Sequence, residues 1–410
     1  MSKETVFFII GGSALIYFVL YLLYSNINKS YINCLTPSLI YYFPILFILE
    51  PINIANNGLS GTVFAYSVIY CTAIFSFAAF ILGLQINIKD GISSNQGARK
   101  IDYSIFPSFI FVLIALLLYA PILFEFKNYL LNPRLVYSAT RVGFGPSFFL
   151  SLVFSNLAII SLFFINKKYL SKLVIISLSS LIIFMHGGKG PVVAIILQFL
   201  IFNVYVNNYR YLFFKSLIIL FLLSFLIITL FYIFYPGIDL SDLVFEISNY
   251  SDFNRNAMLV IDDNKEILLG QLTIGEQFWS RIPRFLFDDK PHDFGAFYLA
   301  KLYFPDAFYG MQGAPAFGVM GVLYADFSFL APFIIIILSL ISGILSKYFI
   351  NKLRFSKNIF LFIGLLFFSS VPLFSMGSGY LLPENLLLGF VALKIINFFS
   401  PGDLCLKKIS

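Results

Sequence analysis

Long apolar stretches recur along the whole chain and constrain its fold more than any other feature. A helical run of about 20 apolar residues matches the hydrocarbon thickness of a bilayer. Uninterrupted runs lack the alternation of barrel strands, so helices must satisfy the backbone in lipid. The sequence therefore predicts an all-α polytopic integral membrane protein with about 11 transmembrane helices (roughly 10–12). The runs lie near residues 5–24, 34–50, 62–85, 104–125, 146–165, 172–187, 190–206, 211–235, 328–350, 358–375 and 381–399.

Composition excludes a soluble protein. Only 11% of the residues are charged, against roughly 25% in soluble domains, and the mean hydropathy is +0.90. The formal net charge of +7 comes from basic residues that lie in the loops between the runs, so no nucleic-acid partner is expected. We expect an integral membrane protein in contact with lipid.

The basic residues predict how the bundle is oriented. Lys and Arg accumulate in short cytoplasmic loops, and alternate loops hold 16 of the 27 basic residues. The opposite connections at 51–61 and 376–383 hold none. This pattern predicts an extracytoplasmic N-terminus and a cytoplasmic C-terminus.

Three segments on the predicted outer side, 126–145, 186–191 and 236–314, hold most of the other basic residues. The longest, 236–314, also contains 12 of the 20 acidic residues and is net negative by six. We therefore expect three units: an N-terminal transmembrane bundle (1–235), an extracytoplasmic loop domain (236–314) with short helices and turns, and C-terminal transmembrane helices (315–410).

The turn HGGKGP at 186–191 joins two apolar runs with almost no linker. Glycine allows a ligand close to the backbone, and a helix N-terminus offers free N–H groups. Together with the charge of Lys189, these features make an anion site plausible. The alternative is an ordinary tight turn in which His186 bonds to a backbone group.

Two outer segments share a spacing of arginine and glycine. Arg134 is followed by ten residues and then Gly145, and Arg284 by ten and then Gly295. Each segment has a second arginine, Arg141 and Arg281 respectively. The planar guanidinium fork suits phosphate oxygens, whereas anchoring to lipid head groups is the alternative.

The stretch 279–305 has the highest density of candidate functional residues. It contains Trp279, Arg281 and Arg284, with three acids, Lys290 and His292. His292 and the adjacent Asp293 are candidates for proton transfer. A solvated loop in which the acids pair with basic residues is the simpler interpretation.

Familiar catalytic and metal motifs are missing from the sequence. It has no HExxH, GxSxG, Walker or paired CxxC pattern and no suitably placed DxD. No metal or other cofactor is expected, and a nucleotide-sugar enzyme is disfavoured. The apolar runs are also nearly free of charges at their centres, unlike those of an ion-coupled pump.

The layout and the short motifs together resemble the Wzy-type O-antigen polymerases, which are oligosaccharide repeat-unit polymerases. The resemblance rests on the paired Arg-x10-Gly segments, on RIPRFLFDDKPHDFG followed by GAPAFGVMGVLYADFSFLAP, and on HGGKGP. In the family the last turn usually carries arginine, so Lys189 departs from the pattern.

The resemblance implies a membrane glycosyltransferase that needs no metal. It would transfer a growing glycan from undecaprenyl diphosphate to the non-reducing end of a new lipid-linked repeat unit, on the periplasmic face of the bacterial inner (plasma) membrane. A flippase and a chain-length regulator would act in the same pathway. The residues implied are Arg134, Arg141, Lys189, Arg281 and Arg284 for diphosphate binding, His292 or Asp293 for acceptor activation, and Trp279 and Tyr298 for sugar binding.

Two other functions remain open at this point. An O-antigen ligase would use the same donor, but its anionic acceptor calls for a basic outer surface, whereas 236–314 is acidic. A lipid-linked oligosaccharide flippase or other transporter would need cations along a central cavity and short loops on both sides, which 236–314 contradicts.

Overall fold

The computed structural model describes residues 3–86, 104–129, 133, 135–136, 144–165, 169–234, 239–263, 266–279, 282, 287, 289–309, 315–369 and 391. The long secondary-structure elements within these ranges are helices. The helices are α1 (Lys3–Asn28), α2 (Thr36–Pro44), α3 (Glu50–Asn57), α4 (Val63–Gln85), α5 (Phe106–Glu125), α7 (Gly145–Phe163), α8 (Tyr169–Met185), α9 (Lys189–Tyr205), α10 (Phe213–Phe234), α11 (Leu240–Ser248), α12 (Asp252–Asp263), α13 (Gln271–Trp279), α14 (Ala296–Tyr303), α15 (Pro305–Tyr309), α16 (Gly318–Phe327), α17 (Ala331–Phe355) and α18 (Ile359–Ser369).

The predicted all-α polytopic fold is confirmed. Seven helical stretches among the described residues are long and apolar enough to cross a bilayer, and α8, α9 and α18 are shorter apolar helices. Helices lie on ten of the eleven predicted runs, whereas 381–399 falls outside the described residues. The exact number of spans stays a prediction.

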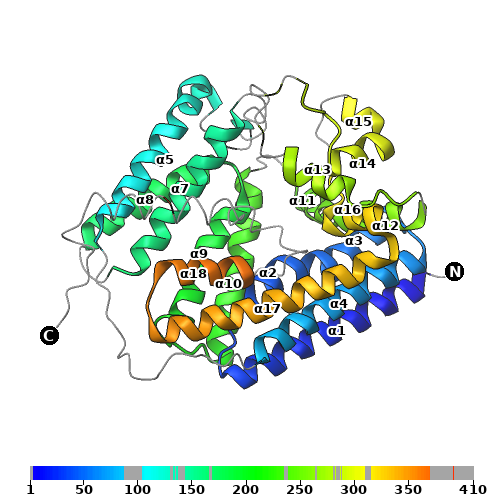
Figure 1. The fold of residues 1–410 in the computed structure, drawn as a ribbon, viewed down its shortest axis with the longest axis horizontal. Coiled ribbons are helices and arrows are strands. Elements are labelled where there is room, and N and C mark those ends of the chain that lie inside the picture. Colours follow the sequence, from blue (N-terminus) through cyan, green and yellow to red (C-terminus); the bar gives the residue numbers. More distant parts are fainter. Residues whose placement is uncertain are drawn as a thin grey trace.

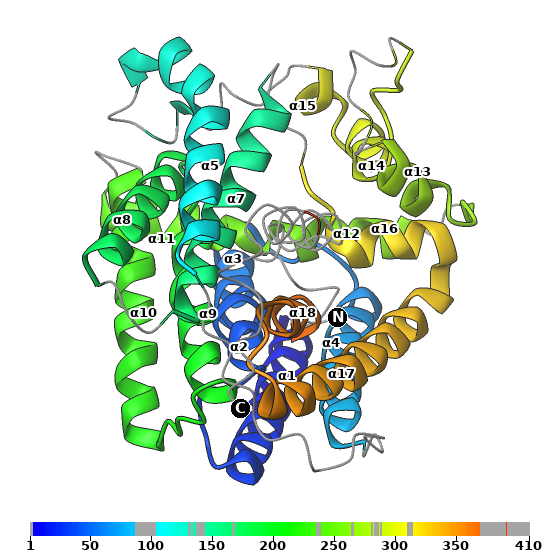
Figure 2. The same ribbon diagram turned by 60° about the vertical axis from the view of Figure 1, so that its left-hand side comes forward.

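Helices α1, α4 and α17 run side by side and form one long edge of the bundle (Figures 1 and 2). The α4–α17 contact is close enough to require glycine. A Cβ at Gly343 would lie 2.2 Å from the Phe80 carbonyl oxygen, and one at Gly83 would lie 2.4 Å from that of Leu340. Small residues let helix backbones approach in this way within a membrane.

The second span extends further than the sequence predicted. The prediction ended at residue 50, but the helix continues to Asn57 through a π-helical segment, Ile45–Leu49. In this register the Glu50 N–H bonds to the Ile45 carbonyl, and Pro51 has no N–H for the Leu46 carbonyl. The Tyr70 hydroxyl donates to that carbonyl instead, at 2.6 Å.

The helices of the predicted loop domain gather beyond the ends of α3, α4 and α17 (Figure 1). Helix α12 is fixed to the start of α4, because the Asp262 carboxylate accepts from the Thr62 N–H at 2.7 Å and from its hydroxyl at 2.5 Å. Thr62 is itself the N-cap of α4. This clamp joins the loop domain to the bundle, and the division of the chain into three units stays a prediction.

Candidate functional site

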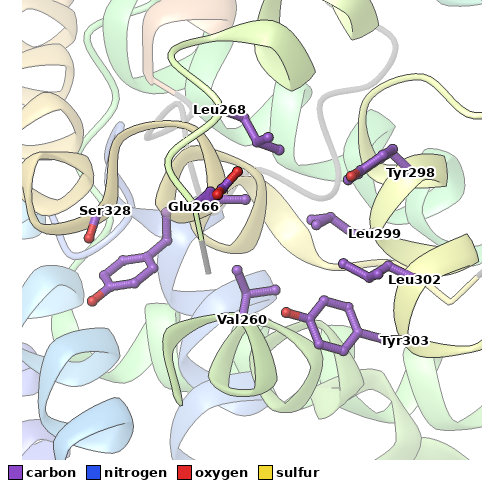
Figure 3. A pocket seen from close by; sticks show the side chains of 10 residues that line it. Val260, Glu266, Leu268, Tyr298, Leu299, Leu302, Tyr303 and Ser328 are labelled. Atoms are coloured by element: carbon purple, nitrogen blue, oxygen red, sulfur yellow. The ribbon is translucent and has the colours of Figure 1, made fainter. Parts of the chain in front are cut away.

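A cavity of about 330 Å³ opens between α12, α14 and α16, as Figure 3 shows. Val260 comes from α12, and Glu266 and Leu268 come from the segment that precedes α13. Helix α14 contributes Tyr298, Leu299, Leu302 and Tyr303, and Tyr324, Ala325 and Ser328 complete the lining from α16 and its end. The cavity thus combines aromatic and aliphatic surface with hydroxyl and carboxylate groups.

Helix α14 presents its residues to the cavity because of their helical spacing. Positions 299, 302 and 303 follow position 298 by one, four and five residues, so all four lie along one face of the helix. The helix begins after Gly295, which has φ +56°. A Cβ there would lie 2.5 Å from the Glu276 Cβ, so only glycine lets α14 pack against α13.

The cavity wall contains a phenol bonded to a carboxylate. The Tyr303 hydroxyl donates to Oδ2 of Asp263 at 2.8 Å. Burial and this hydrogen bond both raise the pKa of Tyr303, so the hydroxyl stays protonated and directed at neutral pH. Exposed Glu266 contributes a carboxylate to the lining itself. Aromatic faces beside fixed hydrogen-bonding groups suit a polar ligand such as a sugar.

Asp326 holds the start of α13 in place. It is fully buried in α16, and its carboxylate accepts from the backbone N–H groups of Leu272 (3.0 Å) and Thr273 (2.7 Å) and from the Thr273 hydroxyl (2.6 Å). A carboxylate is favourable at a helix N-terminus because it satisfies free N–H groups and opposes the helix dipole. Asp326 therefore fixes the helix that leads to residues 281–284.

The structure separates the residues that the sequence grouped around 279–305. Tyr298 lines the cavity, whereas Trp279, at the end of α13, makes edge contacts with Phe278 and Phe287 at ring-centroid distances of 4.9 and 6.3 Å. His292 and Asp293 precede α14 and are outside the lining.

Asp293 forms an ion pair with Lys301. Its Oδ2 lies 2.7 Å from the Lys301 Nζ, and the hydrogen bond from Lys301 lowers the pKa of Asp293. This arrangement matches the simpler interpretation of the segment and makes Asp293 a weaker base. Its assignment and that of His292 to acceptor activation stay predictions.

The predicted diphosphate-binding residues are largely beyond the described part of the chain. Arg134, Arg141, Arg281 and Arg284 lie outside the described residues, as does the side chain of Lys189. Their role stays a prediction. The two glycines of the repeated spacing differ, because a Cβ at Gly145 would meet nothing within 4 Å, unlike one at Gly295.

The HGGKGP turn is as tight as its sequence indicates. Helix α8 ends at Met185, and α9 begins at Lys189. His186 Nδ1 lies 2.6 Å from the Ile182 carbonyl oxygen and Nε2 lies 2.9 Å from that of Phe148. The expected backbone contact is therefore confirmed, and burial lowers the pKa of His186 to about 4, which keeps the ring neutral.

The sequence did not predict a buried polar cluster in the first turns of α3. Glu50 is fully buried and accepts from the Tyr66 hydroxyl at 3.2 Å. Nearby, the Asn53 amide donates to the Ser251 hydroxyl at 2.9 Å, and Arg255 donates to the Asn53 side-chain oxygen. The signal in the sequence was the polar segment EPINIANN, which directly follows an apolar run. Polar residues in such a position can be buried against other parts of the protein instead of ending the span.

Comparison with known proteins decides the family. The chain is 37% identical over 377 residues to the O-antigen polymerase of Salmonella typhimurium, and the match covers 91% of both chains. The same identity and coverage relate it to the O-antigen polymerase of Salmonella typhi.

The chain belongs to the O-antigen polymerase family. The resemblance seen in the sequence is thereby confirmed. No family model matches the chain, and no solved structure matches it. This O-antigen polymerase family member is a multi-pass membrane protein, and the cavity between α12, α14 and α16 is lined by residues that follow α10 and α11 along the chain.

Proposed function

We propose that this protein polymerises a surface polysaccharide at the periplasmic face of the bacterial inner membrane. It transfers the growing glycan from undecaprenyl diphosphate to the non-reducing end of a new lipid-linked repeat unit. The match to O-antigen polymerases over 91% of the chain carries the proposal. The cavity between α12, α14 and α16 supports it, because its lining suits the sugars of the oligosaccharide.

In the proposed reaction an acceptor hydroxyl attacks the anomeric carbon of the donor sugar. The C–O bond to undecaprenyl diphosphate breaks, and negative charge develops on the leaving diphosphate. Fixed cations stabilise such charge more in the transition state than in the ground state. We assign this role to Arg141, Arg281 and Arg284, with Arg134 and Lys189 completing the set.

The acceptor hydroxyl must lose its proton during this transfer, and a carboxylate at the cavity suits that task. Glu266 lines the cavity, whereas Asp293 is paired with Lys301. Glu266 is therefore the stronger candidate among the described residues for general base, with His292 and Asp293 as the alternatives from the sequence. Tyr298 and Tyr303 then contact the sugar.

The decisive experiment is a gel of surface polysaccharide from a strain that lacks this protein, with and without its restoration. Loss of the long-chain ladder, with a single repeat unit still attached to lipid A-core, supports a polymerase. Absence of any repeat unit on the core supports a ligase or a flippase instead and overturns the proposal.

Variants in the same strain test the site. Glu266→Gln and Tyr298→Ala are expected to shorten or abolish the ladder at unchanged protein abundance. Glu246→Gln and Tyr309→Ala are matched controls, because they change the same residue types away from the cavity lining. Wild-type ladders in both cavity variants would contradict the site. Loss of polymer in Asp293→Asn alone would favour the alternative base.

Arg284→Ala tests the diphosphate assignment separately. We expect it to abolish polymer while protein abundance stays unchanged. Wild-type chain lengths in this variant would remove Arg284 from the site without affecting the polymerase assignment.

A further inference from the structure

A second cavity, of about 410 Å³, lies at the opposite end of the bundle from the loop domain. It forms where the end of α1, the α9–α10 connection and the end of α17 come together, at the bottom of Figures 1 and 2. Its polar lining consists mainly of Asn28, Ser30, Asn33, Asn208, Arg210 and Arg354. Neither the family comparison nor the proposed reaction uses this cavity.

The positive charge of this cavity has no acidic counterpart in its walls. Arg210 and Arg354 are its charged lining residues. Among the described residues, neither guanidinium group takes part in a hydrogen bond or an ion pair. The three segments that build the walls, 28–36, 203–215 and 347–358, contain no Asp or Glu, and they hold five lysines.

The wall formed by the loop after α1 and the connection before α10 is fixed by hydrogen bonds. The Asn33 amide donates to the Ser25 hydroxyl at 3.0 Å and to the Ser30 carbonyl at 3.1 Å. The Tyr211 N–H donates to the Ser30 hydroxyl at 3.2 Å, and the Tyr31 N–H donates to the Tyr211 carbonyl at 2.9 Å. These bonds join the loop after α1 to the connection before α10, so the cavity is preformed.

We propose that this cavity binds a phosphate ester, supplied by the head group of an anionic phospholipid in the leaflet on this side. Two guanidinium forks match phosphate oxygens. The ends of apolar helices lie at the depth of lipid head groups, and basic pockets between such helices bind anionic head groups. The volume falls within the range of about 300–1,000 Å³ typical of small-molecule sites, which leaves space for the glycerol beside the phosphate.

A purely structural role for the arginines makes a different prediction. Helices α1, α9 and α17 all end at this cavity, and their C-terminal carbonyl groups carry partial negative charge. Arginines that only balance these helix ends would stabilise the fold equally in neutral and anionic lipid. A lipid site instead makes their contribution depend on the head group.

The experiment uses the purified full-length protein and measures binding of phosphatidylglycerol against phosphatidylcholine in mixed nanodiscs, together with thermal unfolding in each lipid. The test variant is Arg210→Gln with Arg354→Gln. The control is Lys29→Gln with Lys357→Gln, which removes the same charge from the same face but outside the cavity lining. Loss of general surface attraction is then equal in the two variants.

We expect the arginine variant to lose at least about tenfold more affinity for phosphatidylglycerol than the lysine control, which corresponds to about 1.4 kcal/mol. It should also lose the extra thermal stability that anionic lipid gives the wild-type protein. Equal losses in both variants, or equal destabilisation in both lipids, would overturn the proposal. Protection by millimolar inorganic phosphate in neutral lipid, without protection by phosphatidylglycerol, would assign the site to a soluble phosphate ester instead.

Discussion

The α4–α17 interface and the α13–α14 contact both depend on a glycine, but they place different demands on it. At Gly343 the neighbour is the backbone of another long helix, which cannot move aside. At Gly295 the neighbour is the Glu276 side chain, and the glycine also has φ +56°. The first contact sets how the bundle packs, whereas the second sets how the candidate sugar site is shaped. Damage to the two should therefore be separable.

The largest effect is expected at the interface between the long helices. Gly343→Val should cost more than about 3 kcal/mol, because the added carbon meets the Phe80 carbonyl and overpacks a contact without free space. Loss of monodisperse protein in size-exclusion chromatography measures this. Gly12→Val in α1 is the control, because nothing lies within 4 Å of a Cβ there. Equal behaviour of the two variants would refute a close α4–α17 contact.

A smaller and more local effect is expected at the second glycine. Gly295→Ala should cost about 1–3 kcal/mol from its backbone conformation and should displace α14 from Glu276. We expect shorter polymer chains from a protein that is still present in the membrane. Gly145→Ala, in the other arginine–glycine segment, should behave like the wild type. If both variants lose polymer equally, the two segments have equivalent functions after all.

Loss of the Asp326 carboxylate should loosen α13 alone. Asp326→Ala leaves the Leu272 and Thr273 N–H groups without their acceptor, at a cost of about 1–2 kcal/mol. Trp279, the single tryptophan of the chain, ends this helix and reports its environment through fluorescence. We expect a changed emission that Asp326→Asn partly restores. Unchanged emission in the alanine variant would argue against the hydrogen bonds from α13 to Asp326.

The smallest effect is expected for the ion pair beside α14. Both side chains are about a third or more exposed, and exposed ion pairs of this kind contribute little to stability. Because the pKa of Asp293 is lowered in the folded protein, its contribution is present above the unfolded pKa and is lost as the pH falls through the folded value. Asp293→Asn should therefore change unfolding at pH 7 slightly and in strong acid not at all. A larger effect in acid would contradict this sign.

The sequence predicted the membrane-spanning helices well because hydropathy follows directly from composition. It missed the polar continuation after Glu50, since burial by α11 and α12 depends on residues about 200 positions away. It named Tyr298, which lines the cavity, but did not distinguish Glu266 from the other eleven acids of 236–314. Only the packing of α12, α14 and α16 separates them.

The spacing from arginine to glycine is shared by two segments whose glycines differ in the structure. The pattern indicated two matching anion-binding segments, but its glycines occupy unlike environments, one crowded and left-handed and one open. A shared spacing in sequence does not report backbone conformation. The predicted role of the arginines is independent of this difference.

Helix α16 contributes to the cavity lining and also holds the start of α13 through Asp326, but it does so with different side chains. Tyr324, Ala325 and Ser328 touch the cavity, while Asp326 between them points to α13. Positions such as Tyr298 and Leu302 on α14 are exposed. Substitutions at these positions can therefore change the surface of the cavity without disturbing the hydrogen bonds that hold the start of α13.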